Sequence, residues 1–172
     1  MRNKKMVSLP TGNVVTKNAE LSTIDLVKTL LEMQERTFSG YIAACVQGAG
    51  GFEEGMVLFD SGKVVGCAYE YYNHNKVFEG SAAFQRVLNA SAAKNGVVDI
   101  ISLTPEQVQL VLALNEKMVF VPDQKQLQNV KIQEFSPSFE EEAAGVSGAG
   151  PAGITPSRAE LMKKFKLGEM IS

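Results

Sequence analysis

The sequence predicts an α+β fold in which a mainly antiparallel sheet carries helices packed on one face. Short apolar runs follow one another through tight turns between residues 41 and 71, and amphipathic helical patterns stand before and after them. Strict alternation of strand and helix is not seen, and no internal repeat is visible. With 172 residues and a hydrophobic content of 45%, the chain is long enough for one domain with its own core.

The first predicted element is a helix that ends near Thr37. Ile24, Val27 and Leu30 recur at helical spacing, and Ser22 stands where an N-cap is expected. Gly40 closes this unit, because a glycine after an amphipathic stretch is a common helix stop.

Three strands are predicted next, over residues 41–46, 56–59 and 64–71. Residues 60–63, with the sequence Asp-Ser-Gly-Lys, form a tight turn between the last two strands, since glycine tolerates a positive φ. Residues 46–54 are expected to be a long hairpin loop, and the two glutamates of this loop are expected to be solvated.

The second half of the domain predicts two more helices with a strand between them. One helix starts after Gly80 and ends near Asn95, and a β-branched strand follows at residues 97–101. Thr104 begins the other helix, with proline at its first position and the glutamine of a capping box. The alternating fragment at residues 130–133 is a candidate edge strand.

The composition changes at about residue 136, and this change divides the chain into three predicted parts. Residues 1–135 form the α+β domain, residues 136–156 form a flexible linker rich in Gly, Ala, Pro and Glu, and residues 157–168 form a short amphipathic helix. Ser157 and Glu160 make a capping box for that helix.

The terminal helix is the predicted partner-binding element. It has an apolar stripe and a basic flank and is too short to be stable alone in water, so it needs a surface to dock on. Candidate surfaces are its own domain, a second copy of the chain, a groove on another protein, and a membrane surface. The expected contact residues are Arg158, Leu161, Met162, Lys164 and Phe165.

Charge and hydropathy exclude other partners. The net charge is −2, and Lys and Arg are interleaved with acids, so no nucleic-acid partner is expected. No apolar run reaches the length of a membrane span. Without an export signal, Cys45 and Cys67 are expected to be reduced thiols, and the expected location is the cytoplasm.

The chain has few residues of the types that usually carry out catalysis. His74 is the single histidine of the chain and stands in a polar stretch, where a solvated side chain is expected. The two cysteines lack metal-ligand spacing. We therefore expect no catalytic residues, no metal and no cofactor, and an enzyme is the least favoured class.

A second functional hypothesis places a small ligand at the glycine loop. Its candidate residues are Gly48, Gly50, Gly51, Tyr71 and Tyr72. Glycines let backbone N–H groups approach an anion, but the glutamates that follow would repel phosphate. The alternative for the tyrosines is strand packing with their hydroxyls at the surface. A nucleotide or metabolite sensor is thus the alternative to an adaptor.

Three segments resemble the PATAN-type domain, and the resemblance covers roughly residues 21–103. They are Phe38–Ala43, the hairpin Gly55–Ala68 and the helix Gly80–Leu88, which repeat that family's glycine and apolar positions. The chain also resembles an uncharacterised archaeal family in which such a domain is joined to a terminal helix like residues 157–165. The PATAN resemblance implies non-enzymatic signalling through protein contacts, although this sequence carries no receiver domain.

Overall fold

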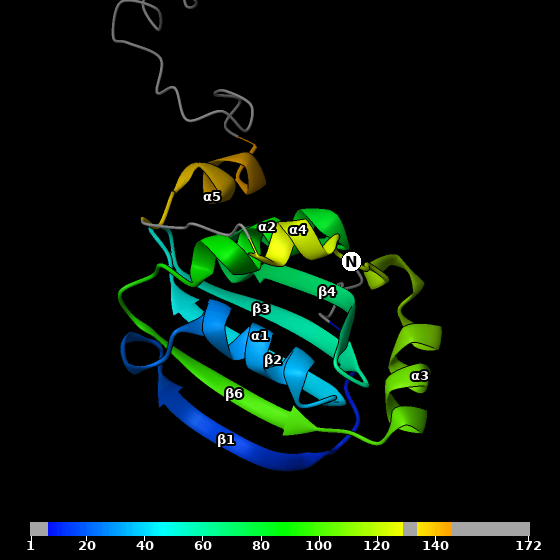
Figure 1. Ribbon diagram of the computed structural model, residues 1–172. Coiled ribbons are helices and arrows are strands. Elements are labelled where there is room, and N and C mark those ends of the chain that lie inside the picture. Colours follow the sequence, from blue (N-terminus) through cyan, green and yellow to red (C-terminus); the bar gives the residue numbers. More distant parts are fainter. Residues whose placement is uncertain (1–6, 129–133, 146–172) are drawn as a thin grey trace, which may run out of the picture.

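The computed structural model describes residues 7–128 and 134–145 of the chain (Figure 1). The predicted edge strand at residues 130–133, most of the predicted linker and the predicted terminal helix lie outside these residues. The elements, in chain order, are β1 (Asn13–Glu20), η1 (Leu21–Thr23), α1 (Leu26–Glu35), β2 (Gly40–Gln47), β3 (Phe52–Asp60), β4 (Lys63–Tyr71), η2 (Tyr72–His74), β5 (Lys76–Glu79), α2 (Ser81–Ala90), β6 (Gly96–Ser102), α3 (Pro105–Leu114), η3 (Glu116–Met118), α4 (Gln124–Gln128) and α5 (Ser138–Ala143).

The fold is a six-stranded antiparallel sheet in the order β1-β6-β2-β3-β4-β5, with helices packed against it, which confirms the predicted class. β2 to β5 form a meander, while β6 returns to pair between β1 and β2. The hairpin turn between β3 and β4 is as predicted, because Ser61 and Gly62 have φ of 50° and 84°, the left-handed values that such a turn needs.

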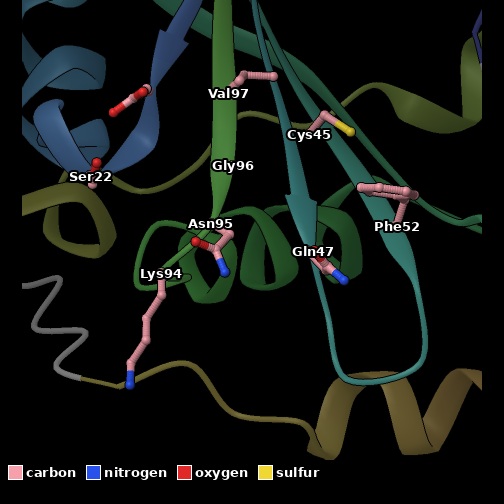
Figure 2. Close-up of a pocket in the computed structure, with 9 residues that line it drawn as sticks. Ser22, Cys45, Gln47, Phe52, Lys94, Asn95, Gly96 and Val97 are labelled. Atoms are coloured by element: carbon pink, nitrogen blue, oxygen red, sulfur yellow. The ribbon is translucent and has the colours of Figure 1, made fainter.

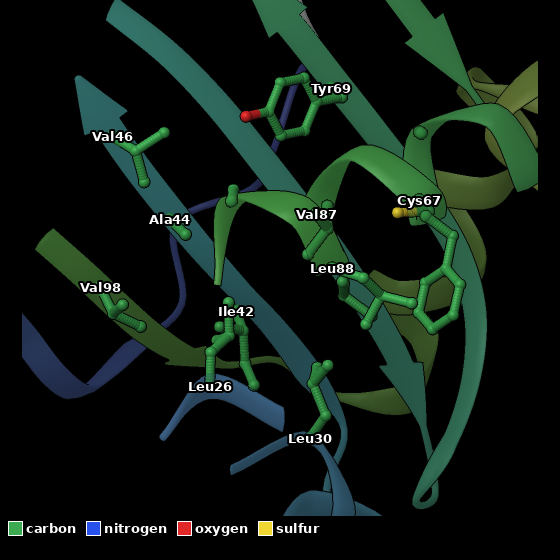
Figure 3. Close-up of a cluster of buried hydrophobic side chains, with 14 of the residues drawn as sticks. Leu26, Leu30, Ile42, Ala44, Val46, Cys67, Tyr69, Val87, Leu88 and Val98 are labelled. Carbon is green, nitrogen blue, oxygen red and sulfur yellow. The ribbon is translucent and has the colours of Figure 1, made fainter. Parts of the chain in front are cut away.

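The larger core lies on the face that carries α1 and α2 (Figure 3). Leu26 and Leu30 of α1 pack there against Ile42 of β2. A Cβ at Gly55 of β3 would lie 2.8 Å from the Val87 side chain of α2, so glycine is required for this close approach. Close packing of α2 on the strands therefore depends on a residue without a side chain.

A second core lies on the opposite face, where α3 packs. Val108 and Val111 of α3 join Met56 and Leu58 of β3 and Met118 of η3. Helices therefore cover both faces, and the expectation of a single covered face is wrong for α3. The run of buried residues from Gly55 to Phe59 is consistent with this, since a strand covered on both sides is continuously apolar.

Side-chain hydrogen bonds cap the N-termini of α1 and α3. Thr104 Oγ1 accepts a hydrogen bond from Gln107 N at 3.2 Å, and Gln107 Oε1 accepts one from Thr104 N at 3.0 Å, which confirms the capping box of α3. The N-cap of α1 is Asp25 rather than the predicted Ser22. Its carboxylate accepts from Lys28 N at 2.9 Å, and residues 21–23 form a 3-10 turn before it.

Several elements differ from the sequence-based expectation, among them β5 and α4, which were not predicted. β3 starts at Phe52, so the predicted long loop is only a short hairpin connection between Gln47 and Phe52. β1 is an edge strand that was not predicted. α5 lies at the start of the predicted linker, and the expectation of a flexible segment is wrong for residues 138–143.

Candidate functional site

The glycine loop between β2 and β3 holds a carboxylate of the same chain. Gly50 N donates to both carboxylate oxygens of Glu140 in α5, at 2.9 and 3.0 Å, and Gly48 N donates to Gly51 O at 2.8 Å. Asn73 Nδ2 donates to Gly50 O and fixes the loop from the side of η2. Glycines here do bring an N–H group to an anion, as the sequence suggested, and the anion is Glu140.

Glu53 lies beneath this loop and is 1% exposed, so the prediction that it is solvated is wrong. Tyr69 Oη donates to Glu53 Oε2 at 2.6 Å. Glu53 Oε1 accepts no hydrogen bond within the described residues and lies beside the Glu140 carboxyl, to which a protonated Glu53 can donate. Burial raises the pKa of Glu53 to about 7, the hydrogen bond from Tyr69 opposes the rise, and the negative charge of Glu140 adds to it.

Charged and aromatic side chains surround these two carboxyl groups. His74 Nε2 lies 3.4 Å from Glu140 Oε1, and the histidine side chain is 25% exposed, so it is less solvated than predicted. The Arg86 guanidinium lies 3.5 Å from the centre of the Phe78 ring, and its Nη2 donates to Glu142 Oε2 at 2.7 Å. We call the group Gly50, Glu53, Tyr69, His74, Arg86 and Glu140 the loop cluster.

The tyrosines predicted as ligand residues divide between two environments. Tyr69 and Tyr71 are 0% and 2% exposed, so their hydroxyls are buried rather than at the surface. Tyr72 is 44% exposed and donates its hydroxyl to Glu54 on the opposite face of the sheet. The structure brings Gly48, Gly50 and Gly51 together with Tyr71 near the loop cluster, but not with Tyr72.

The second feature is a row of side chains that crosses all six strands on the face that α3 covers only in part. Glu20 pairs with Val97, Val97 with Cys45, Cys45 with Glu54, Glu54 with Glu70, and Glu70 with Val77. Because directly paired residues point to the same face, these six side chains share one side of the sheet. α3 covers the neighbouring residues Met56 and Leu58 instead.

This row is uncovered in the described part of the chain and carries large apolar side chains at its margin. Val97 is 37% exposed, and Phe52, which pairs with Gln47 beyond the row, is 60% exposed. We use the name open sheet face for the row together with the exposed residues beside it, Gln47, Phe52 and Tyr72.

One end of the open sheet face is hollowed (Figure 2). Val97, Cys45 and Phe52 stand on three adjacent strands along a depression with a volume of about 400 Å³. Glu20, Ser22, Gln47, Lys94, Asn95 and Gly96 complete its lining. The hollow therefore combines an apolar strip with a polar rim, an arrangement that suits an apolar side chain carried by a polar segment.

The open sheet face is also electrostatically strained. Glu54 and Glu70 stand directly opposite each other, and like charges in that position destabilise a sheet. Burial, followed by the charge of Glu54, raises the pKa of Glu70. Burial and the charges of Glu54 and Asp99 raise the pKa of the Cys45 thiol. Negative potential is thus concentrated on this face.

The sequence did not lead to the open sheet face, because placing the start of β3 at Met56 left Phe52 and Glu54 in a loop. The partner-binding residues that it did predict, Arg158, Leu161, Met162, Lys164 and Phe165, lie outside the described residues. Cys45 and Cys67 are free thiols, as expected.

The described residues contain neither a candidate metal centre nor a membrane-spanning helix. No three or more His, Cys, Asp and Glu side chains are grouped there in a way that could hold a metal ion. None of the helices in this part of the chain has the length and apolar content needed to cross a membrane.

Residues 7–115 match a family described as an uncharacterized protein conserved in archaea (DUF2226). No curated protein and no solved structure matches the chain. The match spans more than half of the sequence and covers β1 to α3, the part that builds the sheet and the open sheet face. The chain belongs to this family of archaeal proteins.

Proposed function

We propose that the protein is a non-catalytic adaptor in cytoplasmic signalling that binds other proteins. In this proposal the open sheet face is one docking element and the C-terminal segment, residues 157–168, is another. The observation that carries the proposal is the row from Glu20 to Val77, where apolar and acidic side chains, exposed or partly exposed, share one surface. Exposed apolar area beside polar residues is typical of protein-binding surfaces.

The like-charge pair supports a binding role for this surface. Glu54 and Glu70 cost stability where they stand, and natural sequences keep such local conflicts mainly at functional sites. A cationic partner would remove the conflict. The resemblance of residues 21–103 to the PATAN-type domain points in the same direction, since it implies a module for protein contacts and signalling.

The test compares the partners captured by three full-length baits. These are the natural chain, a face variant with Glu54→Lys, and a tail variant with Leu161→Ala and Phe165→Ala. Quantitative mass spectrometry of captures from the source organism should show one set of partners lost with the face variant and another with the tail variant. Identical partner lists for all three baits would contradict an adaptor.

A small-ligand sensor at the glycine loop is the alternative that the sequence raised. Gly50 N is already bound to Glu140, so an anionic ligand would have to displace α5 to reach it. Such a ligand would expose α5 as it bound. Thermal-shift screening against nucleotides and metabolites discriminates between the two functions, because only a sensor predicts a rise in melting temperature with one of them.

A further inference from the structure

The open sheet face lacks a cover in the described residues, and its chemistry specifies what would fit it. Phe52 and Val97 offer apolar contact around the hollow. Glu20, Glu54 and Glu70 add three negative charges along the same row, against one cation, Lys94, at the rim. A suitable occupant is a short segment with an apolar stripe and a basic flank.

We propose that residues 157–168 of the same chain dock on the open sheet face and mask it from other proteins. This inference deepens the proposed function and rests on its two docking elements, because it names the first occupant of the face as the chain's own tail. Partner proteins would then compete with the tail for the face.

Charge and apolar content match between the two surfaces. The segment carries four cations, Arg158, Lys163, Lys164 and Lys166, and its anion is Glu160. A lysine beside Glu54 and Glu70 would relieve the repulsion between these two carboxylates, whose opposition is fixed by the strand register. Leu161 and Phe165 recur at helical spacing and supply the apolar side chains for the hollow near Phe52.

α5 packs on the α2 side of the sheet, next to the tip of the β2–β3 hairpin, so the tail has to pass around this tip to reach the open sheet face. Glu140 of α5 is bound at Gly50, the tip of the hairpin whose strands carry Cys45 and Glu54. The chain from Gly50 back to Cys45, part loop and part strand, spans at most about 17 Å. Residues 146–156 include three Gly, two Ala and two Pro, and a flexible chain of this length would have a root-mean-square reach of roughly 18 Å. The connection is therefore long enough, and it gives the tail a local concentration of about millimolar order.

Cys45 gives a direct measurement of docking, because its thiol lies in the row that the tail would cover and the one other thiol, Cys67, is 0% exposed. The rate of its reaction with Ellman's reagent is measured at fixed alkaline pH. In the natural chain the rate should be about tenfold lower than in the variant with Leu161→Ala and Phe165→Ala, and high salt should reduce the difference. Met170→Ala is the matched control, since it removes a tail apolar side chain outside residues 157–168, and its rate should equal that of the natural chain.

Equal rates in the natural chain and the tail variant would overturn the proposal. Protection that increases with protein concentration would also overturn it, because the occupant would then be the tail of a second copy. The experiments distinguish a failure of tail docking from a failure of the proposed adaptor function. Equal rates with different capture lists would leave the adaptor standing without cis docking, whereas a protected Cys45 with identical capture lists would contradict the adaptor.

Discussion

Glu53 makes the free energy of unfolding depend on pH in an unusual direction for a carboxyl group. Its pKa is about 7 in the folded chain against 4.5 for an exposed glutamate. Between these values the folded state holds a proton that the unfolded state has released, so stability falls as pH rises through this window. Complete ionisation of the buried group costs roughly 3 kcal/mol. The contribution of Glu53 to stability is therefore most favourable at the acidic end of the window.

Glu53→Gln tests this directly, because the amide imitates the protonated acid and can still accept from Tyr69 and donate to Glu140. Urea unfolding of the natural chain should show stability decreasing from pH 5 to pH 8, and the variant should be less sensitive to pH and more stable at pH 8. Curves that run parallel for the two proteins over this range would contradict a proton held at Glu53.

The burial of Glu53 shows why single residues of the site escaped prediction. The sequence identified the glycine loop and its capacity to bring N–H groups to an anion. The anion comes from Glu140, about ninety residues away, and Glu53 is buried beside it against Tyr69 of β4. Local pattern contains no signal for such a distant contact, whereas the Thr104 capping box, which is entirely local, was predicted correctly.

At the level of elements, prediction succeeded where hydrophobic periodicity is strong. α2, β4 and β6 have apolar stripes of the expected period and lie within a few residues of their predicted ends. β1 was missed because it is a polar edge strand with an irregular register near Thr16. α5 was missed because its six residues are held by tertiary contacts rather than by helix propensity.

Asn89 is the contact that most directly anchors the segment leading into α5. It is 6% exposed, donates to Ser136 O at 3.0 Å and accepts from Ser136 N at 2.8 Å. Asn89→Ala removes both bonds and should destabilise the docked segment by about 1–3 kcal/mol. Hydrogen exchange measured by mass spectrometry should then be faster for residues 134–145.

The matched control for this experiment is Asn95→Ala, which truncates an exposed asparagine at the rim of the hollow. Exchange at residues 134–145 should remain at the natural rate in this variant. If both variants exchange equally fast there, Asn89 does not anchor α5.

At the scale of the whole molecule, strand register decides which side chains share a surface. Glu20 and Val77 are far apart in sequence and lie at opposite edges of the sheet, yet they belong to one row through four intermediate residues. The sequence predicted β2, β3, β4 and β6 but not β1 or β5, and it did not predict how the six strands pair. The composition of the open sheet face was therefore inaccessible, while the basic and apolar character of residues 157–168 could be seen at once.

Glu70→Lys separates the stability of the domain from the use of its open sheet face. An opposite-charge pair with Glu54 should replace a repulsive one and raise the free energy of unfolding by roughly 0.2–1 kcal/mol. We expect this gain in the background of Leu161→Ala and Phe165→Ala, where tail docking does not contribute. Glu134→Lys, at an exposed position outside the strands and helices, controls for the same change in net charge.

In the natural chain, Glu70→Lys should weaken the docking of residues 157–168 on the open sheet face. The introduced ammonium group would repel the cations of residues 157–168, so Cys45 should react with Ellman's reagent about as fast as it does in the tail variant. A domain that is more stable and at the same time unmasked would mean that the repulsion between Glu54 and Glu70 is retained for binding. A domain that loses stability in the tail-variant background would show instead that Glu70 is part of the structural framework.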